Sequence, residues 1–179
     1  GEERLLPLSE EAPASLPAPF EGLLEVDAEQ PEPFPRRWLE RLPQWVPEEV
    51  IKANEGYWPN AQEPLGDLLV FKLEKEIQQY AQEIALAKLA HHQTVRAAFW
   101  DKGVEGEFRV RNLEPLAARH DGEVFSRVEL DSLEPDVRAE LLSTRTRVRE
   151  HGVDIDIDPG TAFFSHRLQT ERSRTIDSA

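Results

Sequence analysis

The chain has 179 residues and a net charge of −14, and it contains no cysteine. This length fits one domain of ordinary size with extensions. The negative charge argues against nucleic acid and anionic membrane surfaces as partners, because both attract basic proteins. The absence of cysteine excludes disulfides, thiolate nucleophiles and cysteine-based metal sites.

No apolar segment approaches the roughly 20 residues that a membrane helix needs, so the sequence predicts a soluble protein without a transmembrane segment. The chain begins with Gly1 rather than methionine, which we interpret as a sign of processing at the N-terminus. The composition indicates no particular compartment, because proteins without disulfides occur in all of them.

Residues 1–64 form an acidic, proline-rich segment. They hold eleven of the 14 prolines, and they carry fourteen acidic against five basic side chains. This proline density prevents long helices and keeps strands out of sheet interiors. Large apolar residues recur along the segment, which a purely solvated linker does not need. We therefore predict an extended arm that lies in a groove of its own chain or of a neighbour.

Two short helices are predicted within this segment, at residues 35–42 and 47–54, because each begins with proline and ends beside a helix breaker. Large aromatic side chains gather around them, and such side chains often anchor interfaces. They are Trp38, Trp45, Tyr57 and Trp58. Two interpretations remain open: these side chains cover the core of their own chain, or they form a patch that binds a protein partner.

Residues 65–102 predict one long helix. Apolar side chains recur in steps of three and four, and good helix formers surround them. The positions are Val70, Leu73, Ile77, Tyr80, Ile84 and Ala87. At about 1.5 Å per residue such a helix would be roughly 50–55 Å long, which exceeds a compact domain of this size. It either packs on its own sheet or forms a seam between chains.

A partner interface is predicted where the aromatic patch and the helix seam meet. Its residues are Trp38, Trp45, Tyr57, Trp58, Leu73, Ile77, Tyr80 and Ile84.

The C-terminal half predicts strands at residues 107–113 and 123–130, because apolar and polar residues alternate there, and Pro115 is expected to end the first. A second helix is predicted from residue 131 or 132 to Gly152. Its basic residues either form a solvated face or bind an acidic partner. They are Arg138, Arg145, Arg147 and Arg149.

Residues 153–158 alternate strictly and predict a strand whose outer face carries Asp154, Asp156 and Asp158. Charge on an edge strand prevents pairing with other chains, which is the first interpretation. The second is a divalent-cation site completed by residues elsewhere. The calcium-loop pattern does not match, because Pro159 occupies the position of its glycine.

The sequence therefore predicts an α+β fold: a long central helix with a small antiparallel sheet and a second helix, preceded by a Pro-rich extended arm. The predicted division is residues 1–64 for the acidic arm, 65–159 for the α+β core and 160–179 for a polar tail.

No catalytic motif is present among the patterns we sought, which include phosphate-binding glycine loops, nucleophile elbows and His-Glu-x-x-His zinc sites. His91 and His92 are adjacent, so on a helix their side chains diverge and do not chelate one ion. We assign no catalytic, cofactor-binding or metal-binding residue, and we expect no cofactor.

The leading hypothesis is a non-enzymatic structural or adaptor subunit of a larger assembly, such as a virion or organellar complex. It would dock on protein partners, as a homo- or hetero-oligomer, through its arm, tryptophan patch and long helix. The sequence favours a non-enzymatic protein over an enzyme, with no nucleic acid and no membrane as partner. One alternative is a small metal-dependent enzyme or metal-binding domain, and another is an acidic regulatory module. The metal alternative would use His91, His120 or His151 with Asp154, Asp156 and Asp158.

Overall fold

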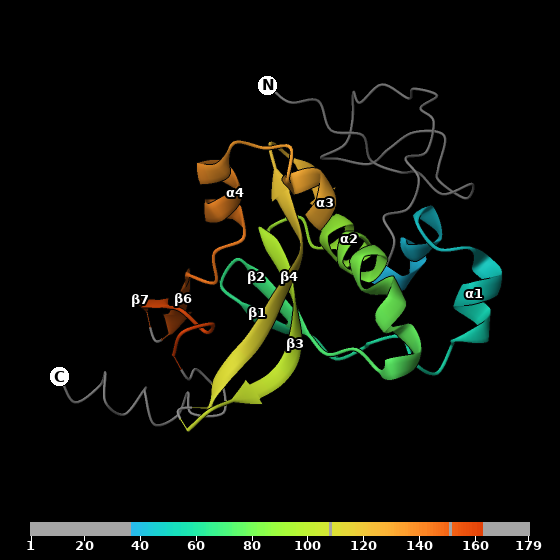
Figure 1. Cartoon of the computed structure of the whole chain (residues 1–179), viewed down its shortest axis with the longest axis horizontal. Helices are drawn as coiled ribbons and strands as arrows, with labels where there is room; N and C mark the ends of the chain where they lie inside the picture. The colour runs from blue at the N-terminus through green and yellow to red at the C-terminus, as the bar shows by residue number, and fades with distance from the viewer. Residues whose placement is uncertain (1–36, 108, 151, 163–179) are drawn as a thin grey trace, which may run out of the picture. The chain divides into compact units, whose positions relative to one another are not determined.

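The computed structural model describes residues 37–107, 109–150 and 152–162. They form a five-stranded mixed sheet, a separate two-stranded hairpin and short helices (Figure 1). The helices are the 3₁₀ turns η1 (Trp38–Glu40), η2 (Leu42–Gln44) and η3 (Lys75–Tyr80), and the α-helices α1 (Glu48–Ala53), α2 (Ala81–His91), α3 (Arg127–Leu130) and α4 (Pro135–Leu141). The strands are β1 (Glu63–Leu65), β2 (Leu68–Phe71), β3 (Ala97–Glu105), β4 (Val110–His120), β5 (Glu123–Ser126), β6 (Thr146–Glu150) and β7 (Val153–Ile157). No helix among these described residues is long and apolar enough to cross a bilayer.

The large sheet has the order β1-β2-β3-β4-β5, and only β2 and β3 run parallel. Parallel neighbours need a crossover, which η3 and α2 supply. The antiparallel pairs β1–β2 and β4–β5 are joined by two-residue turns. In the second turn Asp121 and Gly122 both have positive φ, as tight hairpin turns require.

Around β2 and the first residues of β3 the sheet is buried on both faces. On β2, Leu69 and Phe71 join a core with α2 and the N-terminal helical turns, whereas Leu68 and Val70 join a second core. That second core contains Leu130 of α3, and Leu141 of α4 also belongs to it. Figure 1 shows α2 on one side of the strands and α4 on the other. The strands in the middle are therefore apolar on both faces, which removes the alternation that marks a half-exposed strand.

The predicted long central helix is wrong. Residues 65–102 contain β1, β2, η3, α2 and the start of β3, and only α2 is an α-helix. A continuous apolar run in a buried strand has no period that separates it from a buried helix, so β2 and β3 resembled helix turns. The sheet is also larger than predicted and is mixed rather than antiparallel.

In the C-terminal half, the first predicted strand appears as β4 from Val110, whereas the second ends at Ser126 because α3 occupies Arg127–Leu130, and the predicted helix is reduced to α4. β4 continues through Pro115 because the register with β3 shifts beside Phe99, and proline is tolerated at such a bulge. The helix ends at Leu141, and the arginines at positions 145–149 belong to β6 and the residue before it. The strand predicted at residues 153–158 is confirmed as β7. Most of the predicted arm and tail lies outside the described residues, and the three-part division stays a prediction.

The hairpin β6–β7 is fixed to the large sheet through the turn between β1 and β2. Gly66 in this turn has a φ of 56°, and Thr146 of β6 lies directly against it. The Thr146 hydroxyl donates to the Asp67 carboxylate at 2.6 Å, and the Asp67 backbone N–H donates to that hydroxyl at 3.1 Å. A side chain at position 66 would separate these two elements.

We predict that Gly66→Ala lowers the free energy of unfolding by at least about 2 kcal/mol. The new methyl group would overlap the Thr146 hydroxyl and the Arg147 carbonyl, in a backbone conformation that favours glycine. Urea denaturation measures this loss. Gly56→Ala is the matched control, since nothing lies near its Cβ, and it should stay within about 0.5 kcal/mol of the parent. Equal effects of the two substitutions would contradict the packing of β6 on this turn.

Candidate functional site

The outer face of the β6–β7 hairpin carries a row of paired charges, which we call the arginine ladder. Its three ion pairs are Arg145–Asp158 at 3.7 Å, Arg147–Asp156 at 2.7 Å and Arg149–Asp154 at 3.5 Å. Residues alternate between the two faces of a strand, so the arginines share one face while Thr146 and Val148 point inward. The ladder is strongly charged locally but neutral in sum.

The central pair of the ladder is the best aligned. Arg147 donates from Nε to one oxygen of Asp156 at 2.7 Å and from Nη2 to the other at 3.2 Å. The hydrogen bonds from Arg147 lower the pKa of Asp156, and those to Asp156 raise the pKa of Arg147. The side chains of Arg147 and Asp156 are 64% and 75% exposed, and exposed pairs of this kind contribute little to stability.

Arg96, at the residue before β3, holds the chain segment that leads into the hairpin. Its guanidinium donates to the carboxylate of Asp67 at 2.8 Å and to four backbone carbonyls. The carbonyls belong to Glu140, Leu141, Ser143 and Arg145. Burial raises the pKa of Asp67, but the hydrogen bonds from Arg96 and Thr146 outweigh it and leave that pKa below its usual value. The first arginine of the ladder therefore has a fixed backbone.

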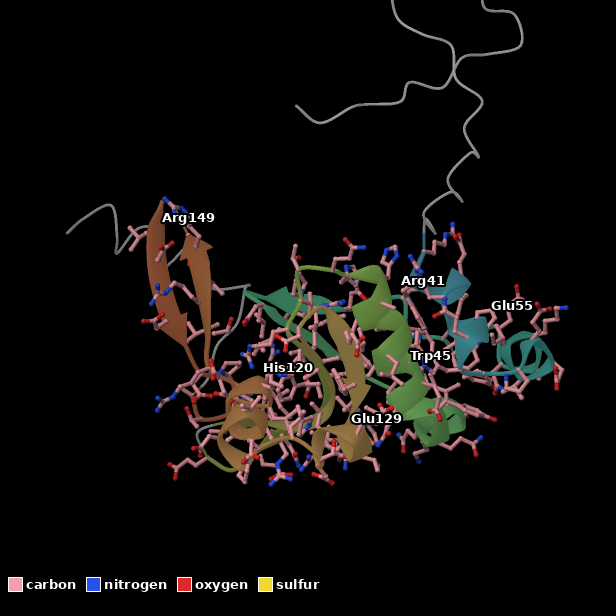
Figure 2. All side chains as sticks on the ribbon, turned by 90° about the horizontal axis from the view of Figure 1, so that it is seen from above. Arg41, Trp45, Glu55, His120, Glu129 and Arg149 are labelled. Carbon is pink, nitrogen blue, oxygen red and sulfur yellow. The ribbon has the colours of Figure 1, made fainter. Side chains whose placement is uncertain are left out.

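An open depression of about 580 Å³ lies along part of the ladder. Its lining consists of Arg145, Thr146, Arg147, Asp156, Ile157 and Asp158. Arg149 lies at the end of the hairpin, on the far side of the described region from Trp45 and Glu55 (Figure 2). The site is thus a charged, open surface rather than an enclosed reaction pocket.

One polar side chain of α2, that of Lys88, is buried in the protein. Lys88 is completely buried, yet its ammonium donates to the Pro59 carbonyl at 3.1 Å and to Gln62 Oε1 at 2.8 Å. It also lies 4.1 Å from the ring centroid of Trp38, a cation–π contact. Burial lowers the pKa of Lys88 to about 7. Because it is inaccessible, Lys88 serves as a tether between α2 and residues 59–62 rather than as a catalytic group.

The described histidines, His91, His92 and His120, do not form a metal-binding cluster with the aspartates of β7. His92 is bonded to Gln62 at 2.6 Å, and its pKa is lowered by burial and by the neighbouring charges of His91 and Lys88. His120 lies 3.4 Å from Asp121 at the β4–β5 turn. Across the described residues, no group of three potential metal ligands comes together. His151 lies outside them.

The structure brings most of the predicted interface residues into one core. Five are buried there: Trp38, Trp58, Leu73, Ile77 and Ile84. Trp45 and Tyr80 pack against this core while partly exposed, and Tyr57 is 44% exposed. The arrangement matches the interpretation that the aromatic side chains cover their own core. A partner contact at Tyr57 stays a prediction.

Sequence reasoning missed Asp67, Arg96 and Lys88 as organising residues. Lys88 has the appearance of an ordinary surface lysine on a helix, and its partners lie 26 and 29 residues away. The residues near Lys88 in the sequence give no indication of such a contact. The ladder did leave a signal, since residues 145–150 alternate in the same way as residues 153–158.

The comparisons with known proteins point to enzymes that act on tRNA. The family model described as the TYW2 N-terminal domain matches residues 40–122. The tRNA (guanine(37)-N(1))-methyltransferase Trm5b of Pyrococcus abyssi is 27% identical over 169 residues, which cover 93% of this chain and 42% of that protein. The chain therefore spans less than half the length of this relative.

Solved structures that resemble this chain also include Trm5b. The crystal structure of Trm5b from Pyrococcus abyssi matches with a TM-score of 0.53 and 26% identity, over 87% of this chain and 39% of that chain. A complex of aTrm5 with tRNALeu matches with a TM-score of 0.54 and 25% identity over the same shares. The TYW2 structure from P. horikoshii shares the fold, with a TM-score of 0.50 and 20% identity, over 76% of this chain and 38% of that chain.

These similarities correct several predictions. The non-enzymatic structural or adaptor subunit is wrong, and so is the preference against an enzyme, because the relative Trm5b is a tRNA methyltransferase. The exclusion of nucleic acid is wrong, because a similar structure is the complex of aTrm5 with tRNALeu. The predicted fold class is overturned by the same structures. Net charge misled here because it averages over the chain and does not describe one surface.

The buried Lys88 gives a testable pH dependence. Its pKa is about 7 in the folded chain against an unperturbed 10.5, so between these values the unfolded chain binds more protons. The free energy of unfolding should therefore rise with pH from about 7 towards 10. Denaturation of the parent and of Lys88→Met at pH 7 and pH 9.5 checks this, and the rise should disappear in the variant.

The exposed Lys52 on α1 supplies the control for this experiment. Lys52→Met should keep the pH dependence of the parent chain. A parent stability that stays flat or falls over this range would contradict the buried, easily deprotonated state of Lys88.

Proposed function

We propose that this chain is the RNA-binding part of a tRNA methyltransferase. The observation that carries the proposal is the similarity to Trm5b, a tRNA (guanine(37)-N(1))-methyltransferase, over 93% of this chain. The match to the TYW2 N-terminal domain and the likeness to the aTrm5–tRNALeu complex support it. The chain corresponds to only 42% of the relative, so we assign it recognition of the RNA rather than the whole reaction.

The described residues do not fit a methyl-donor site, which a methyltransferase also requires. Small-molecule sites are enclosed and lined mainly by apolar and aromatic groups. Two depressions in the described part of the chain, beside the hairpin and beside the start of β4, are open, and no aromatic side chain lines either of them. We therefore derive no methyl-transfer step from these residues. Their contribution is to bind and orient the RNA.

The charge of the chain limits how it binds RNA. With a net charge of −14, long-range attraction of a polyanion is absent, and contact depends on individual guanidiniums close to phosphates. Arginine suits this role because its planar fork donates two parallel hydrogen bonds to a phosphate. Few such contacts release few counterions, so binding should depend only moderately on salt.

We predict that the chain binds tRNA with a log–log salt slope of roughly 3–5, as expected for a handful of phosphate contacts. Fluorescence anisotropy with labelled tRNA between 50 and 200 mM salt measures this slope. A DNA duplex of equal charge is the control and should bind more weakly, since RNA is recognised by its shape and 2′-hydroxyls. Absence of tRNA binding at low salt would overturn the proposed function.

A further inference from the structure

We infer that the arginine ladder is the phosphate-contacting surface of this chain, and that each of its arginines exchanges its aspartate for an RNA phosphate. The inference rests on the proposed function, because it takes RNA as the partner. It adds a specific site, Arg145, Arg147 and Arg149, and a specific mode of binding.

The first support is the geometry of the ladder. Its arginines occupy alternate positions, so their Cα atoms are about 7 Å apart along one line. The side chains are 85%, 64% and 71% exposed in the order Arg145, Arg147, Arg149. They form a straight row of accessible guanidiniums, which can follow the repeating phosphates of a strand.

The second support is that the row stands on a fixed base. The Arg145 carbonyl accepts from Arg96 at 2.9 Å, and Thr146 is bonded to Asp67. Val148 is buried in the core beneath. The backbone that carries the arginines is therefore ordered before RNA arrives, which lowers the entropy lost on binding.

The third support is that the aspartates are easily displaced. Arg145–Asp158 and Arg149–Asp154 are loose contacts of 3.7 and 3.5 Å. Asp158 keeps other partners when Arg145 leaves, since Thr144 donates to it at 2.5 Å and the Gly160 N–H at 3.3 Å. Exposed pairs are weak, whereas a bidentate arginine–phosphate pair is among the stronger polar contacts.

The aspartates then act as a filter on what binds. Their negative charges cancel the long-range electrostatic attraction of the arginines. A polyanion that makes no close contact with the guanidiniums is therefore not bound. An RNA that places phosphates within hydrogen-bond distance of the guanidiniums displaces the carboxylates. The aspartates remain nearby and repel the phosphate, so they weaken binding without being needed for the fold of the hairpin.

This mode of binding predicts that replacing the arginine and replacing the aspartate of one pair change the tRNA affinity in opposite directions. Arg147→Gln should weaken tRNA binding about fivefold to tenfold and reduce the salt slope by about one. Asp156→Asn should tighten tRNA binding about fivefold, because it removes a negative charge beside the guanidinium that takes the phosphate. If the pair served only to hold β6 and β7 together, both substitutions would change binding in the same direction.

The pair between Arg138 of α4 and Asp131 supplies the controls, because it is a partly exposed pair at 3.0 Å outside the hairpin, where Asp131 is also paired with Arg127 at 3.0 Å. Arg138→Gln and Asp131→Asn change the total charge by the same amounts. Both controls should leave the affinity within about twofold of the parent. Thermal melting of all four variants verifies that they are folded.

Anisotropy titrations with tRNA then separate the outcomes. Weaker binding by Arg147→Gln together with tighter binding by Asp156→Asn, with unchanged controls, supports the inference. If the parent binds tRNA while both hairpin variants match it or shift in the same direction, the inference is overturned and the proposed function stands. A parent chain that does not bind tRNA overturns both.

Discussion

The fold depends on one cation, the guanidinium of Arg96, which joins three parts of the chain. Its backbone N–H donates to the Asp67 carbonyl at 2.7 Å, at the edge where β2 and β3 pair. Its side chain binds the Asp67 carboxylate and four carbonyls of residues 140–145. Two of these carbonyls, those of Glu140 and Leu141, lie in the last turn of α4, where helix acceptors lack partners within the helix; the Glu140 carbonyl also accepts from the Ser143 N–H at 3.2 Å. Lysine could not replace this planar, five-donor group.

The hydrogen bonds of Arg96 also link the core to the proposed RNA surface. The large sheet is buried on both faces around β2 and the start of β3, so this part presents little surface of its own. The hairpin β6–β7 instead attaches to the β1–β2 turn, through the hydrogen bond from Thr146 to Asp67. Arg96 also holds the residue before β6, because its guanidinium donates to the Arg145 carbonyl. One face of the hairpin completes the core with Val148, and the other face is left to the arginine ladder. A rigid base and weakly paired charges are the combination that a surface for phosphates requires.

The sequence indicated a few local elements correctly and the long-range structure poorly. The strand β7 followed from strict alternation, and α1 from Pro47 with two acidic residues after it. The central sheet was missed because β2 and β3 are buried on both faces, so their side chains have no polar alternation. The anchoring residues could not be predicted, since Asp67 meets Thr146 across 79 positions. The arginines of β6 were recognised as a basic group but assigned to a helix, although alternation with Thr146 and Val148 was visible.

The account's central claim is that RNA phosphates replace aspartates at the arginine ladder. The most direct measurement is the ¹⁵N-edited NMR signal of each arginine Nε–H while tRNA is added. We predict that the signals of Arg145, Arg147 and Arg149 shift, whereas that of Arg138 on α4 stays in place. Unmoved ladder signals, together with shifts at arginines elsewhere in the chain, would contradict the claim.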